Sequence, residues 1–328
     1  MEETIFSVTK EMLFLLLIIG LGFILKKWAV FNSLYKLINA KNLETAKITF
    51  WRRLAKLTYN VSFPALMLAK LGQKEWQADY FPFLGGSLKL GTIYLATIVT
   101  LAYVIPQPKR FKQLSAAIAH QGNTAFLGFP LIIGVMGEEF LPYAAMLSAL
   151  MLVLGNATGI IVFGLSQGKS IPNMIKQTAT KLCLDPVILG CLAGAFVAYF
   201  NVGQNAWWQP VQTTTNIIGW TATPLALLCI GSNLKFQKTN ASCVVISSFL
   251  KLIIAPLIIF TAMRFFSDLK QEFNLLIILL LSTPVAASMT IFVEKYSGDR
   301  DLITATSNTI TLSTLLSIIT LSLTVLLV

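Results

Sequence analysis

Five residues within one short segment, GNTAFLGFPL, combine polar side chains with a backbone that bends easily: Gly122, Asn123, Thr124, Gly128 and Pro130. Proline removes a backbone donor and disfavours helical geometry at the preceding residue, and glycine lowers the cost of bending. The segment lies inside an apolar stretch long enough to cross a bilayer, where each unpaired backbone group costs free energy. Asn123 and Thr124 can supply hydrogen bonds there. The segment therefore predicts an interrupted helix beside a polar site.

A second segment carries the same chemistry nearer the C-terminus, with Ser282, Thr283 and Pro284 followed by Ser288 and Thr290. Interrupted helices at corresponding places in two halves of a membrane protein point to a binding site near the bilayer midplane. Read singly, each segment is also compatible with a proline kink in which Ser and Thr bond back to their own helix. As a pair, the segments favour a substrate site.

The chain has ten apolar runs, and the two interrupted segments lie in the fourth and the ninth of them. The chain has 328 residues, of which 55% are hydrophobic and 12% are charged, against about 25% charged residues in soluble domains. The net charge of +11 is spread between apolar runs and not gathered on one face, which argues against nucleic-acid binding. The runs cover 8–27, 55–71, 80–104, 112–136, 140–166, 183–200, 211–232, 241–263, 273–294 and 302–327. The composition predicts an all-α polytopic membrane protein.

The two halves of the chain resemble one another. Three pairs of residues recur in the same order at offsets of 160, 162 and 154: Pro64 with Pro224, Lys89 with Lys251, and Pro130 with Pro284. Five spans per half is an odd number, so the second half enters the membrane upside down. This arrangement predicts two inverted five-helix repeats, 1–166 and 167–328, in one integrated membrane domain, which is a common plan of secondary transporters.

Lysine and arginine residues predict the orientation. Of the 25, 17 fall in loops on one side, 5 fall on the other side with the termini, and 3 remain inside spans. Because cytoplasmic loops carry the excess of positive charge, both termini are expected to be extracytoplasmic in a multi-pass protein of a bacterial-type inner (cell) membrane. The longest loop, 28–52, is basic, and it reads equally as a surface helix or as a solvated loop.

Two of the lysines inside spans, Lys89 and Lys251, lie within about one turn of the expected midpoints, at a rise of 1.5 Å per residue. A charge at that depth costs free energy, and no carboxylate is expected in the same layer. We expect each lysine to neutralise the negative C-terminal end of an interrupted helix. Direct contact with the substrate and snorkelling to the membrane surface stay open.

Three other polar residues are candidates for the site. Asn156 and Asn308 follow the two prolines of the interrupted segments by 26 and 24 residues, and they either touch substrate or bridge helices. His120, the only histidine, precedes the first interrupted segment. A proton relay and a packing role both remain open for it.

The sequence disfavours an enzyme, because one histidine and no carboxylate near a span centre provide neither a nucleophile with its base nor a metal site. No cofactor and no metal are expected. The four cysteines have no metal-binding spacing. A channel or a ligand sensor with the transporter fold is the alternative to a carrier. Saturable uptake would distinguish a carrier from a channel, and binding without flux would indicate a sensor.

Four segments resemble the auxin efflux carrier family, which includes plant PIN-formed proteins and bacterial malate and malonate carriers. They are GNTAFLGFPLIIGVMG, DPVILGCLAG, TATPLALLCIGSNL and STPVAASMTIFVEKY. The resemblance implies a fold similar to bile-acid symporters and sodium/proton antiporters, with ten helices and with broken fourth and ninth helices that cross. It also implies an elevator-like carrier of small organic carboxylates.

Carried over by motif, Asn123, Thr124, Gly128 and Pro130 form one arm of the crossing, and Thr283 and Pro284 form the other. Some plant members have an acidic residue four positions before the lysine that Lys89 resembles, and this chain has Gly85 there. Coupling to H⁺ or Na⁺ is therefore left open. The expected partners are a small organic anion and the lipid bilayer, and a homodimer is left open.

Overall fold

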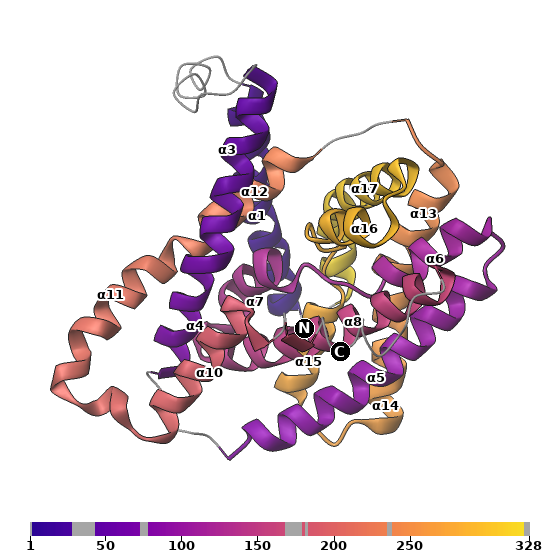
Figure 1. Cartoon of the computed structure of the whole chain (residues 1–328). Helices are drawn as coiled ribbons and strands as arrows, with labels where there is room; N and C mark the ends of the chain where they lie inside the picture. Colours follow the sequence, from indigo (N-terminus) through magenta and orange to yellow (C-terminus); the bar gives the residue numbers. More distant parts are fainter. Residues whose placement is uncertain are drawn as a thin grey trace. The chain divides into compact units, whose positions relative to one another are not determined.

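The computed structural model describes residues 2–27, 43–72, 78–167, 179–180, 183–234 and 238–324. Within these ranges all extended regular elements are helices, and one isolated β-bridge joins Gly122 to Val285. The all-α class is therefore confirmed. Most of the basic loop 28–52 lies outside the described residues, and its last part is helical. Figure 1 shows the elements in chain order.

The helices of the first half are α1 (Glu2–Lys27), α3 (Leu43–Leu57), η1 (Thr58–Ser62), α4 (Phe63–Gly72), α5 (Tyr80–Val104), α6 (Lys109–Ile118), η2 (Thr124–Gly128), α7 (Phe129–Met136), η3 (Glu138–Phe140) and α8 (Leu141–Gln167). Those of the second half are α10 (Pro186–Tyr199), η4 (Val202–Gln204), η5 (Ala206–Trp208), α11 (Gln209–Trp220), α12 (Ala222–Asn233), α13 (Ala241–Phe249), η6 (Leu250–Ile254), α14 (Ala255–Phe266), α15 (Gln271–Leu281), α16 (Met289–Ser297) and α17 (Arg300–Thr324).

Four helical stretches of the described residues are long and apolar enough to cross a membrane. They are Tyr80–Val104, Glu138–Gly164, Ala241–Phe266 and Arg300–Thr324. Each coincides with one of the expected spans. Several other expected spans consist of shorter helices that meet at breaks, because proline, glycine and polar residues interrupt them. The helices support a protein that crosses the membrane several times, while the count of ten and the inverted repeat stay predictions.

Contacts divide the chain into two compact units. Unit 2 comprises Glu11–Trp76 and Asp185–Leu234, and unit 1 comprises Met1–Lys10, Gln77–Leu184 and Lys235–Val328. Each unit is therefore built from both halves of the sequence. The boundary expected between 166 and 167 separates sequence repeats and does not separate these units.

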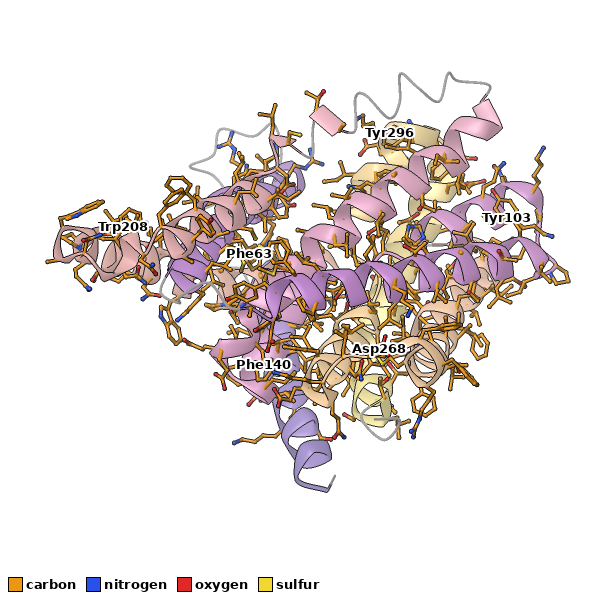
Figure 2. All side chains as sticks on the ribbon, turned by 90° about the horizontal axis from the view of Figure 1, so that it is seen from below. Phe63, Tyr103, Phe140, Trp208, Asp268 and Tyr296 are labelled. Carbon is orange, nitrogen blue, oxygen red and sulfur yellow. The ribbon has the colours of Figure 1, made fainter. Side chains whose placement is uncertain are left out.

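Unit 2 is built around α4, which packs against α10 and α11. Phe63, at the start of α4, is fully buried (Figure 2). A Cβ added to Gly190 of α10 would lie 2.7 Å from the backbone of Pro64, so these helices approach as closely as a glycine permits. Asp185 accepts hydrogen bonds from the N–H groups of the first turn of α10 and from the Tyr59 hydroxyl, at 2.8 Å from the latter. Asp185 is therefore a helix cap.

Unit 1 contains the four long apolar helical stretches. In it α5 packs beside α14, α6 and α8, and α17 packs beside α13 and α16 (Figure 1). The start of α5 is joined to the connection between α14 and α15 by an ion pair of 2.7 Å between Asp79 and Lys270. The hydrogen bond to Asp79 raises the pKa of the Lys270 ammonium group. Because Lys270 is exposed, this pair contributes little to stability.

Candidate functional site

Two helices of unit 1 stop and restart in the two segments singled out by the sequence. The first, α6, ends at Ile118, and the chain becomes helical again at Thr124. The second, α15, ends at Leu281, and α16 begins at Met289. The proline residues lie where the geometry requires them, since Pro130 is in the first turn of α7 and Pro284 is in the second gap.

The two gaps pair with one another through their backbones. The Asn123 N–H donates to the Pro284 carbonyl at 2.7 Å, and the Ala286 N–H donates to the Gln121 carbonyl at 3.0 Å. The Val285 N–H donates to the Ser313 hydroxyl of α17 at 3.2 Å. Backbone freed from a helix must find such partners in a membrane. We call residues 119–123 and 282–288 the crossing.

Gly122 makes this pairing sterically possible. A Cβ at this position would lie 2.5 Å from the Thr283 hydroxyl oxygen, and 3.3 Å from both the Leu280 carbonyl and the Lys251 ammonium nitrogen. Gly128, six residues further along the chain, packs against the side chain of Leu280. Both glycines therefore allow one interrupted helix to approach the other.

Lys251 lies against the crossing. Its side chain is 0% exposed, and its ammonium group donates to the Leu281 carbonyl at 2.8 Å and to the Tyr94 hydroxyl at 2.9 Å. Tyr94 in turn donates to the His120 carbonyl at 3.1 Å. Leu281 is the last residue of α15, so the ammonium group sits at a helix end that carries partial negative charge. This contact is the one that charge compensation requires, and its effect on stability is a prediction.

The backbone around Lys251 is itself irregular. Lys251 lies in η6, a single turn of π-helix between α13 and α14. A π-turn inserts one additional residue into a helix, so it changes the direction in which the side chains beyond it point. In η6 the side chain of Lys251 is directed towards the C-terminal end of α15.

Lys89 does not share this arrangement. Its side chain is 49% exposed, and its ammonium nitrogen lies 4.0 Å from a carboxylate oxygen of Asp268. Asp268 follows α14 (Figure 2). Asp268, in a connection between helices, is therefore the acidic neighbour of Lys89, and a role of Lys89 in neutralising a helix end stays a prediction. Its contacts fit a side chain that extends towards a loop.

Two polar side chains of the crossing are buried without a partner. Asn123 is 3% exposed, and its amide nitrogen has no hydrogen-bond partner among the residues that the structure describes. The Ser282 hydroxyl, on the opposite segment, is also buried and has no hydrogen-bond partner among those residues. Since buried polar groups are normally hydrogen-bonded, these two atoms mark a place suited to a polar ligand.

The protein's family is evident from its sequence as a whole. A profile of the membrane transport protein family matches residues 7–325. The chain belongs to this family. The resemblance to auxin efflux carriers is thereby confirmed. A curated relative, "Uncharacterized transporter MJ1031" of Methanocaldococcus jannaschii, is 28% identical over 163 residues, which are 48% of this chain and 50% of the relative. The match thus spans half of the relative's length.

The other candidate residues of this membrane transport protein lie at varying distances from the crossing. Asn156 of α8 is joined to it through Gln121, whose amide nitrogen lies 3.4 Å from the Asn156 oxygen. Thr283 is buried and bonds back to the Leu280 carbonyl at 2.7 Å. Asn308 is buried in α17, and Ser288 is exposed immediately before α16. Thr124 is half-buried at the start of η2.

Sequence reasoning missed three residues that this transport protein places at the crossing. They are Tyr94, Gln121 and Ser313. Gln121 directly precedes the glycine of the first segment, so its position was a usable signal. Tyr94 and Ser313 come from other helices, and only the packing of unit 1 brings them there.

A shallow groove of about 300 Å³ lies elsewhere on unit 1 of this family member, lined among others by Ile93, Ile258 and Phe265. Its two threonine hydroxyls, of Thr97 and Thr261, bond back to their own helices. The groove therefore offers an anion no free donor. The crossing is the better candidate for a substrate site.

Proposed function

We propose that the protein is a secondary transporter of small organic anions, and that the substrate binds at the crossing. The observation that carries the proposal is the buried amide nitrogen of Asn123, which has no partner among the described residues and lies beside two interrupted helices. An amide nitrogen is a donor only, so its natural ligand is an acceptor such as a carboxylate oxygen.

The charges around the crossing favour an anion. Lys251 brings a positive charge to the end of α15 and offsets the negative partial charge of that helix end. Two helical segments, η2 with α7 and α16, begin directly after the gaps. Their N-terminal ends contribute positive partial charge and backbone N–H groups, which is a common way to hold an anion. Carboxylates such as malate, malonate or auxin-like acids fit this chemistry.

The proposed mechanism is elevator-like alternating access. Unit 1 carries the crossing, and it would move with the bound anion relative to unit 2. Membership of a membrane transport family supports a carrier. Saturable exchange would identify a carrier, a conductance without saturation would identify a channel, and binding without flux would identify a sensor.

We expect Asn123→Ala to weaken anion binding while leaving the protein folded. Removing one charge-assisted hydrogen bond costs about 1.5–3 kcal/mol, which is a loss of affinity of roughly 10- to 150-fold. Thermal shift of the purified protein with malate, malonate and indole-3-acetate gives the affinity, and uptake of the same acids into proteoliposomes gives the rate. A ligand that binds only the folded state stabilises it by RT ln(1 + [L]/Kd), so the melting temperature rises with the concentration and the affinity of the ligand.

Asn205→Ala is the matched control for this substitution, because Asn205 is an exposed asparagine of unit 2. It should bind and transport like the parent. If the Asn123→Ala and Pro284→Ala variants both transport like the parent as well, the substrate site lies elsewhere in the chain.

We also expect both termini to face away from the cytoplasm. The division of basic residues, 17 against 5, carries this prediction. Single cysteines at positions 2 and 36, in a background without the four native cysteines, should react with impermeant maleimide from opposite sides of the membrane. Labelling of position 2 from the cytoplasmic side would contradict the ten-span arrangement.

A further inference from the structure

His120 occupies the first unwound segment and is 1% exposed. Its Nδ1 lies 2.9 Å from the Ala116 carbonyl oxygen of α6, and its Nε2 lies 3.1 Å from the Gly155 carbonyl oxygen of α8. Each ring nitrogen thus faces a backbone oxygen, and a backbone oxygen can only accept a hydrogen bond. Neither Asn123 nor Lys251 is needed to satisfy the ring.

The arrangement distinguishes the two protonation states of the ring. A neutral imidazole has one N–H group, so only one of the two contacts is a hydrogen bond, and the other sets a lone pair against a carbonyl oxygen. An imidazolium ring has two N–H groups and satisfies both oxygens at once. The geometry around His120 is therefore complete only when the ring carries a second proton.

Other groups oppose a permanent charge on this ring. The ammonium group of Lys251 in η6 donates to the same Tyr94 hydroxyl that donates to the His120 carbonyl, and it repels a second positive charge. Of the helices that pack on α6, α5 carries Tyr80, Lys89, Tyr94 and Tyr103, and α13 carries the buried Cys243 thiol. Tyr94 is the α5 side chain that bonds to His120, through the His120 carbonyl. The charged side chains of α17 are Arg300 and Asp301 at its start, and Asp301 pairs with Arg110 at the beginning of α6.

On α8, the segment 144–164 has no ionisable side chain. The carbonyl oxygens thus favour the charged ring, and Lys251 with the apolar surroundings favours the neutral ring. A ring held between these two opposing effects can change its protonation state when a nearby charge, such as a bound anion, is added or removed.

His120 is itself part of the crossing, and short contacts join it to the residues around the candidate anion site. Its own carbonyl accepts from Tyr94, and the next residue, Gln121, accepts from Ala286 across the crossing. Gly155, which faces the ring, precedes Asn156, and the Asn156 side chain contacts Gln121. A shift of the ring on losing its proton would therefore move backbone on both sides of the candidate anion site.

We propose that His120 carries the coupling proton of this transporter, so that one H⁺ moves with each organic anion. The anion would bind at the crossing while the ring is an imidazolium, and both would leave on the other side, where the ring returns to its neutral form. Binding is reciprocal: an anion at the crossing favours the proton, and the proton favours the anion to the same extent. This inference rests on the proposed function, because it needs an anion site.

Two measurements test the coupling. In proteoliposomes with the membrane potential clamped, a pH gradient should drive malonate accumulation by about tenfold per pH unit for one proton per anion. His120→Gln keeps an amide donor for one carbonyl but cannot be charged, so it should transport malonate down its own gradient with no response to pH. Liposomes without protein provide the background.

The second measurement reads the ring directly. The chain has a single histidine, so ¹⁵N-histidine labelling gives the NMR signal of one imidazole in the intact protein. Added malonate should raise the pH at which this ring loses its second proton. A ring that stays neutral between about pH 5 and 8 with and without malonate would overturn the inference.

The outcomes separate the two levels of the argument. Saturable malonate uptake that ignores the pH gradient would overturn the coupling and leave the transport function standing. Absence of both binding and uptake for malate, malonate and indole-3-acetate would count against the proposed function and would remove the coupling with it. Proton-driven uptake that persists in His120→Gln would assign the proton to another group.

Discussion

Lys251→Met is expected to destabilise the protein by about 1–3 kcal/mol, the cost of leaving a buried polar group without its partner. The substitution removes the donor to the Leu281 carbonyl and the positive charge at the end of α15, and both lie in the fully buried interior of unit 1. Methionine also removes the cost of burying an ammonium group, which works in the opposite direction. We expect the carbonyl and the helix end to dominate, because methionine cannot satisfy either of them.

Reversible unfolding in mixed micelles would measure this change. Lys89→Met is the matched control: the same substitution removes an exposed ammonium group whose neighbour is a loop carboxylate, and surface pairs of this kind are worth about 0–1 kcal/mol. Anion binding should weaken in Lys251→Met but persist. If binding is abolished and stability is unchanged, Lys251 contacts the substrate directly and does not act by neutralising α15.

Gly122→Ala should have a comparably large effect, through the backbone of the crossing. Its Cβ would lie 2.5 Å from the Thr283 hydroxyl oxygen and 3.3 Å from the Leu280 carbonyl. Overpacking a well-filled interior costs about 1–3 kcal/mol. Since the added atom sits between the paired segments, we expect the Asn123–Pro284 hydrogen bond to lengthen and anion binding to fall below detection. Thermal unfolding and the malonate thermal shift would show the two effects separately.

Gly85→Ala is the control, since a Cβ at Gly85 meets nothing within 4 Å. Combining Gly122→Ala with Thr283→Ala removes the closest contact, so the double variant should recover part of the lost stability relative to the sum of the single variants. Stability of Gly122→Ala equal to that of the parent would mean that the crossing adjusts freely, contrary to the tight packing described here.

The sequence predicted the interruptions because their causes are local. Proline and glycine act on their own backbone, and Asn123 and Thr124 stand beside them, so the positions of both gaps followed from residue types alone. The pairing of the gaps followed only from the resemblance to a family, because hydrogen bonds between residues 121–123 and 284–286 depend on the packing of helices far apart in the chain.

The two lysines illustrate what the sequence could not distinguish. Lys89 and Lys251 are predicted from the sequence to be counterparts in the two repeats, yet one reaches a loop carboxylate and the other a helix end. The direction of each side chain depends on which face of its helix is covered, and for Lys251 also on the π-turn of η6. Neither property is visible from residue spacing. Tyr94 was missed for the same reason, since its partners lie on other helices.

The hydrogen bonds that join the two segments of the crossing affect how the sequence of such a protein can diversify. The two hydrogen bonds that join the segments use only main-chain atoms, from Gln121 and Asn123 on one side and from Pro284 and Ala286 on the other. Mutation can therefore replace the side chains of Gln121, Asn123 or Asn156 without removing these bonds, provided that Gly122 is kept. Under the proposed function, selectivity for a different anion would therefore arise by single substitutions that leave both main-chain hydrogen bonds in place.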